Sequence, residues 1–163
     1  VLSAALAPFA PVPHIVLQGA KRVLREHAEG TQAFGRMCAF HGQMGMFTRA
    51  LTYMMSHGSD GLRQVAEDAV LNANYLLARL KPHFNAPFGD RPCMHEVLLD
   101  DSSIKPKGVE TIDVAKALLD EGYHPFTTYF PLVVHGAMLI EPTETEPKRE
   151  LDRFADVMIA LAE

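Results

Sequence analysis

The stretch AMLIEPTETEPKRELDRF, residues 137–154, joins an apolar run to a polar segment and then to a helical pattern. The run Ala137–Ile140 is short and apolar, which is typical of a buried strand, and the apolar residues after the prolines recur at helical spacing. Thr145 is a candidate N-cap, because it leaves Pro147 in the first turn, where a missing N–H loses no intrahelical bond. A capping box from Thr143 to Glu146 is the alternative. The glutamates oppose the positive end of the helix dipole, so we interpret the segment as a strand-to-helix connection rather than an acidic active site.

The same two patterns alternate through the second half of the chain. Residues 59–80 carry one apolar stripe at helical spacing, which must end before Pro82. The sequence then predicts a strand over 94–99, a helix over 111–121 that Gly122 ends, and strands over 126–132 and 137–140. A long helix followed by β-α-β-β-α indicates an α+β fold, a small sheet with helices mainly on one face.

The first third of the chain is less regular. An extended leading segment rich in proline is followed by a strand near residues 14–17, and four glycines interrupt residues 30–45. A helix is expected over 46–56, ending at His57-Gly58. We therefore divide the chain into residues 1–58 (leading segment, glycine-rich loop and first helix) and residues 59–163 (long helix and small α+β domain).

Composition excludes several classes of protein. The chain has 163 residues, 48% of them hydrophobic, so one domain with a sizeable core is expected. A net charge of −5 argues against a dedicated nucleic-acid or anionic-membrane surface. No apolar run approaches the roughly 20 residues that span a bilayer. Cys38 and Cys93 have neither a CxxC nor a zinc-site spacing, which favours reduced thiols in a cytoplasmic compartment.

The segment HEVLL begins at His95 like the zinc-protease motif HExxH, but its fifth residue is Leu99 rather than histidine. The sequence therefore predicts no metal site. In a strand, His95 and Glu96 would point to opposite faces. Arg91, four residues before His95, is a candidate for binding an anion beside that histidine. The alternatives are a hydrogen-bonded buried histidine and a surface arginine.

The segment FGRMCAFHGQMGMF, residues 34–47, is a glycine-rich loop that leads into a helix. Free N–H groups and the helix dipole could seat a phosphate there. Its spacing matches neither the Walker A motif nor the dinucleotide fingerprint, so an ordinary loop is the alternative.

Several segments resemble the C-terminal third of the glycine cleavage system P-protein, the pyridoxal-phosphate-dependent glycine decarboxylase. They are GLRQVAEDAVLNANYLLARL, CMHEVLLD, VETIDVAKALLDEGYHPFTTYFPL and MLIEPTETEPKRELDRFADVMIAL, in the family's order. GRMCAFHGQMG and YFPLVV resemble the bacterial split form of the enzyme, in which this region ends subunit 2. The resemblance implies the small C-terminal domain of an aspartate-aminotransferase-type (fold type I) enzyme.

What the family does defines further expectations for this chain. The family decarboxylates glycine with pyridoxal phosphate and transfers the aminomethyl group to the lipoyl group of the H-protein. By this resemblance the substrate-binding candidates are Arg91 and His95, and the loop of His41, Gly42 and Gln43 is the candidate for contacting the cofactor phosphate. The remaining P-protein domain or subunit, the lipoylated H-protein and glycine are the expected partners, in a bacterial cytoplasm.

One departure from the family concerns its Schiff-base lysine, which lies next to a histidine and before a glycine-rich stretch. In the family this lysine lies upstream of the segment that matches Val1, so we expect no catalytic residue in this chain. None of its six lysines has that context; they are Lys21, Lys81, Lys105, Lys107, Lys116 and Lys148. We therefore expect a C-terminal fragment that is inactive alone and that self-associates through the face left open. The alternative is a non-catalytic binding module with an aminotransferase-like small domain.

Overall fold

The computed structural model describes residues 2–37 and 42–163. Contacts divide the chain into two compact units, which meet between Ser56 and His57. The first unit contains the short 3₁₀ helix Ala7–Phe9 and a hairpin of β1 (His14–Gln18) and β2 (Lys21–Arg25). The strand expected near residue 14 is confirmed. β2 was missed because three of its five residues are basic and give no apolar signal.

Three residues named in the sequence-based predictions lie outside the described residues. They are Val1, Cys38 and His41. The position of the family's Schiff-base lysine, expected upstream of Val1, therefore stays a prediction. The same holds for the contact of His41 with a cofactor phosphate and for the state of the Cys38 thiol.

The helix α1 spans Met44–Leu80 but is interrupted at Gly58, whose backbone has φ 66° and ψ −177°. Residues other than glycine rarely adopt a positive φ, so this glycine ends one helical segment and lets another begin. The sequence predicted this break at His57-Gly58 and the end of the second segment before Pro82, and both are confirmed.

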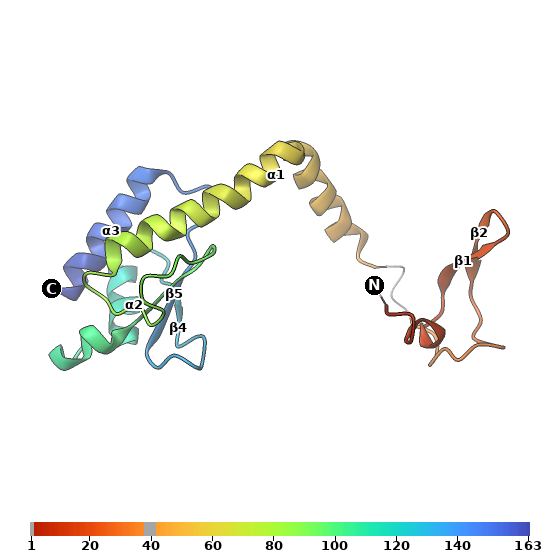
Figure 1. Cartoon of the computed structure of the whole chain (residues 1–163), viewed down its shortest axis with the longest axis horizontal. Coiled ribbons are helices and arrows are strands. Elements are labelled where there is room, and N and C mark those ends of the chain that lie inside the picture. The colour runs from red at the N-terminus through yellow and green to blue at the C-terminus, as the bar shows by residue number, and fades with distance from the viewer. Residues whose placement is uncertain (1, 38–41) are drawn as a thin grey trace. The chain divides into compact units, whose positions relative to one another are not determined.

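The second unit has the predicted order of elements after the long helix. The elements are β3 (Val97–Asp100), two 3₁₀ turns (Asp101–Ser103 and Lys105–Lys107), α2 (Thr111–Asp120), β4 (Thr127–Thr128), β5 (Ala137–Ile140) and α3 (Lys148–Ala162). The strands form one antiparallel sheet in the order β3-β5-β4, so β5 is central. Figure 1 labels β4 and β5 of this sheet together with the three helices. The α+β fold is confirmed.

Two local predictions, the length of β4 and the N-cap of α3, are wrong. β4 has two residues rather than seven, because the chain turns away at Tyr129, whose φ is 57°. The N-cap of α3 is Pro147 rather than Thr145, with no side-chain cap. Asn72 of α1 instead donates from its side-chain amide to the carbonyls of Thr143 (2.9 Å) and Glu146 (3.3 Å), which fixes the connection before α3.

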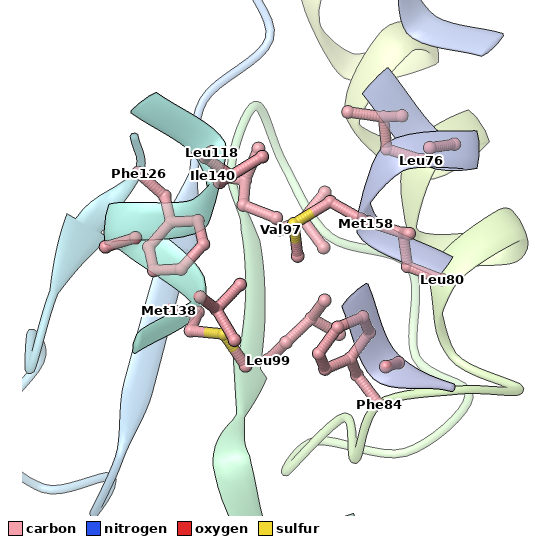
Figure 2. Close-up of a cluster of buried hydrophobic side chains, with 14 of the residues drawn as sticks. Leu76, Leu80, Phe84, Val97, Leu99, Leu118, Phe126, Met138, Ile140 and Met158 are labelled. Atoms are coloured by element: carbon pink, nitrogen blue, oxygen red, sulfur yellow. The ribbon is translucent and has the colours of Figure 1, made fainter. Parts of the chain in front are cut away.

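The core lies on one face of this sheet. Val97, Leu99, Met138 and Ile140 alternate along paired positions of β3 and β5 and point into it (Figure 2). All three helices contribute to the same cluster, which also includes Leu76, Leu80, Val114, Leu118, Leu151, Ala155 and Met158. The helices therefore cover the core face, as predicted, and the residues between these positions, such as Leu98 and Leu139, belong to the opposite face.

A buried polar contact joins the start of α2 to the turn before β5. Asp101 is 3% exposed, and its Oδ2 lies 3.3 Å from the hydroxyl of Thr111. That hydroxyl donates to the carbonyl of Gly136 at 2.6 Å. Gly136 has φ 66°, and a Cβ there would lie 2.1 Å from Oδ1 of Asp101. Only glycine fits between these groups.

Candidate functional site

A cleft of about 720 Å³ is lined in part by Leu98 and Leu139, which belong to the face of the sheet opposite the core. Its walls are largely apolar and come from three parts of the second unit: the segment 86–98, the turn at Phe130-Pro131, and single residues of α1 and β5. Arg91, His95 and Glu96 are the charged or ionisable side chains of the lining, apart from the thiol of Cys93. An apolar cleft with a few polar groups has the character of a small-molecule site.

The segment that carries Arg91 and His95 is held by α1. The side-chain amide of Asn74 donates to the carbonyl of Cys93 at 2.7 Å, and its carbonyl oxygen accepts from the Cys93 N–H at 3.0 Å. An asparagine side chain offers both groups, so it pairs with an irregular peptide as a neighbouring strand would. This two-way contact fixes the backbone between the two candidate residues.

The structure brings Arg91 and His95 to the same cleft. The guanidinium carbon of Arg91 lies 5.5 Å from the centroid of the Phe88 ring, a cation–π contact. Within residues 2–37 and 42–163 Arg91 forms no ion pair. Its fork of N–H donors is therefore available to an anion that enters the cleft.

His95 lies in a bend before β3, because that strand begins at Val97 rather than at residue 94. The prediction that His95 and Glu96 point to opposite faces is consequently wrong. The Nε2 atom of His95 is 3.9 Å from Oε1 of Glu96 and 3.8 Å from Oε1 of Glu141, which follows β5. Nothing in the sequence signalled Glu141, since the pairing of β3 with β5 brings it there.

Burial raises the pKa of the Cys93 thiol, which lines the cleft between the two candidate residues. Desolvation disfavours the thiolate, the form that acts as nucleophile. The local hydrogen bond to the backbone lowers the pKa by less than burial raises it. The cleft therefore offers a cationic anchor and an imidazole, but no activated thiol.

The candidate phosphate loop belongs to the first unit. His41 lies outside the described residues, whereas Gly42 and Gln43 directly precede α1. The carbonyl of Gln43 accepts from the N–H groups of Met46 (2.9 Å) and Phe47 (3.2 Å). Gly42 has φ 112°, and a Cβ there would lie 2.5 Å from Cζ of Phe47. The close approach of the ring explains why glycine stands at the start of the helix.

A sequence model of the family described as "Glycine dehydrogenase, C-terminal domain" matches residues 65–163. The chain belongs to this family. The match covers α1 from Val65 onward and the whole sheet with α2 and α3, and thus every residue that lines the cleft.

Curated relatives carry the same description along nearly the whole chain. The probable glycine dehydrogenase (decarboxylating) subunit 2 of Caulobacter vibrioides is 63% identical over 165 residues, 99% of this chain and 32% of that protein. Its counterpart in Bacillus cytotoxicus is 50% identical over 96% of this chain and 31% of that protein. The chain thus spans about a third of the length of the curated relatives it matches, and the predicted resemblance to the split-subunit type is confirmed.

A crystal structure of glycine decarboxylase (P-protein) of the glycine cleavage system, in inhibitor-bound form, has a similar fold. The TM-score is 0.56 at 24% sequence identity, over 68% of this chain and 24% of that one. This likeness supports the predicted fold. Among the described residues, no helix combines the length and the apolar character needed to cross a membrane.

Proposed function

We propose that this chain is the small domain of a pyridoxal-phosphate-dependent glycine decarboxylase of the split-subunit type, and that Arg91 and His95 recognise the carboxylate of glycine. The observation that carries the proposal is the meeting of both side chains in one cleft of a chain that belongs to the glycine dehydrogenase C-terminal family. The relatives are named as decarboxylating enzymes, which favours this function over a non-catalytic binding module.

The residues of the cleft suit that task. Glycine presents only a carboxylate and an amine, and a guanidinium binds a carboxylate through two parallel hydrogen bonds. Arg91 has no carboxylate partner among the described residues, and the apolar walls reduce competition from water. His95 lies on the same lining and would orient the bound carboxylate. Both residues would thereby align the bond that breaks when CO₂ leaves.

The cofactor would be held mainly by residues outside this chain's cleft, and the Schiff-base lysine would lie upstream of Val1 in the longer protein. In this chain, Gly42 and Gln43 would bring backbone N–H groups and the N-terminus of α1 to the cofactor phosphate, and the close Phe47 ring at Gly42 fits a tightly built loop. Pyridoxal phosphate supplies an electron sink for the carbanion that decarboxylation leaves. The lipoylated H-protein would accept the aminomethyl group, and the remaining P-protein subunit would complete the site, in the cytoplasm of a bacterium.

The test is the exchange of glycine carboxylate with bicarbonate, measured in the complete two-subunit enzyme. Arg91→Ala and His95→Ala should each lower turnover by more than they weaken cofactor binding, because the lost contact aligns the reacting bond. Arg91→Lys should recover only part of the activity, since lysine cannot make the bidentate contact.

The matched controls are Arg63→Ala and His135→Ala, which remove an arginine and a histidine outside the cleft. Arg63 is paired with Glu67 one turn away on exposed helix surface. Both controls should exchange like wild type. Wild-type exchange by folded Arg91→Ala and His95→Ala enzymes would contradict the proposed roles.

A further inference from the structure

Three side chains with metal-binding atoms converge at the rim of the cleft. The imidazole of His95 and the carboxylates of Glu96 and Glu141 present ligand atoms that all lie within 4.8 Å of one another. The sheet produces this arrangement. Val97 pairs with Ile140 in the antiparallel register, so Glu96 and Glu141 are the next residues on neighbouring chains as the sheet ends.

The two carboxylates of this cluster, Glu96 and Glu141, would be stabilised by a cation. Like charges that face one another across antiparallel strands are unfavourable. In the described part of the chain, no lysine or arginine forms an ion pair with Glu96 or Glu141, and Nε2 of His95 lies 3.9 and 3.8 Å from their Oε1 atoms. A positive ion between the two carboxylates would remove the repulsion and would take a nitrogen of the imidazole as a further ligand.

We propose that His95, Glu96 and Glu141 bind a divalent metal ion of the zinc type at the rim of the cleft. Imidazole favours zinc and similar transition metals over magnesium and calcium, which prefer oxygen ligands alone. One nitrogen and two oxygen ligands resemble the three-ligand zinc sites that keep a fourth position open. Here the fourth position would face the cleft that Arg91 also lines.

The geometry needs only a small adjustment. Bonds of about 2.0 Å in a tetrahedron place neighbouring ligand atoms about 3.3 Å apart. The present Nε2–Oε1 separations are 3.8 and 3.9 Å, and all three ligand atoms, including the two carboxylate oxygens, lie within 4.8 Å of one another. The three side chains are 53%, 40% and 59% exposed, so they can rotate inward without disturbing the core. The binding does not depend on the decarboxylase function.

The experiment is a calorimetric titration of Zn²⁺ into the purified full chain, in a buffer that does not chelate zinc. We expect one ion per chain and a dissociation constant of about 10 μM. His95→Ala and Glu141→Gln should each weaken binding at least tenfold. Cobalt should give the visible absorption of a four-coordinate site in the wild type, and the same two variants should lose it.

The controls are His135→Ala and Glu121→Gln, a histidine and a glutamate outside the cluster, which should bind zinc like wild type. Without metal, the Glu141→Gln chain should melt at the wild-type temperature or above it, because the substitution removes one of two like charges. A chain that melts normally but binds zinc weakly has a binding defect rather than a folding defect. A wild-type dissociation constant above about 100 μM would overturn the proposal. Wild-type affinity, or a loss of less than tenfold, in the His95→Ala and Glu141→Gln chains would overturn it too, since the ion would then sit elsewhere.

Discussion

Replacing Gly136 with alanine tests the buried polar contact that positions the central strand of the sheet. Gly136 precedes β5, has φ 66°, and lies against the carboxylate of Asp101. An alanine Cβ would approach Oδ1 of Asp101 to 2.1 Å and its Cγ to 2.4 Å. Since both atoms belong to a side chain that is 3% exposed, the carboxylate must move away from Thr111 or the turn must open.

The magnitude follows from two separate terms. Placing a residue with a Cβ at this positive φ costs about 1–2 kcal/mol. Displacing Asp101 leaves a buried polar group without its partner, which costs about 1–3 kcal/mol more. We expect Gly136→Ala to lower the free energy of unfolding by about 2–5 kcal/mol. That is a large share of the stability of a small domain.

Gly89→Ala is the matched control. Gly89 has φ 67°, but a Cβ there would meet nothing within 4 Å. It should therefore cost only the backbone term of about 1–2 kcal/mol. Urea denaturation followed by circular dichroism measures both variants. In an Asp101→Ala background, the loss of unfolding free energy caused by Gly136→Ala should shrink to that caused by Gly89→Ala, because the carboxylate that clashes with the new Cβ has been removed. Equal destabilisation by the two alanine variants in the wild-type background would refute the reasoning.

Three further predictions concern the isolated chain. Mixed with pyridoxal phosphate and reduced with borohydride, it should retain no cofactor, because no lysine has the context of the family's reactive amine; a stoichiometric adduct would contradict this. It should self-associate in sedimentation experiments, since Met44, Phe47, Leu51 and Met55 expose about half of their surface or more on α1; a strict monomer at high concentration would argue otherwise. In a Cys38→Ala variant, iodoacetamide should alkylate Cys93 more slowly than in urea at the same pH, because burial raises the pKa of that thiol; equal rates would exclude a folded-state effect.

The helices and the order of strands could be predicted because local sequence determines them. Local sequence predicts where two of the helices run and end, whatever packs against them. The apolar stripe of residues 59–80 indicates a helix, and the glycines at residues 58 and 122 mark helix ends. The central strand Ala137–Ile140 could be predicted equally well, since it is a short run of apolar residues that ends at the polar segment Glu141-Pro142. The α+β fold follows from these elements.

Errors arose where a distant residue decides a local conformation. The cap of α3 is a case in point, because Asn72 lies 71 positions before Thr143, whose carbonyl it binds. A local rule cannot weigh such a contact against a threonine cap. The short β4 is a separate case: Tyr129 and Phe130 are aromatic residues typical of strands, yet the backbone of Tyr129 adopts φ 57° and the strand ends before it.

In the candidate site, too, some residues could be predicted from local sequence, whereas another is brought there only by the pairing of strands. Arg91 and His95 were found from the sequence because both stand in one short segment whose chemistry is visible in the residue types. Glu141 was not, since 45 positions separate it from Glu96 and only the register Val97↔Ile140 makes them neighbours. The two glutamates were read as separate local features, one as part of an incomplete zinc-protease motif and the other as part of a polar connection. In the metal site proposed above, the ligand that would replace the second histidine of that motif comes from across the sheet rather than from four residues along a helix, and it is the carboxylate of Glu141.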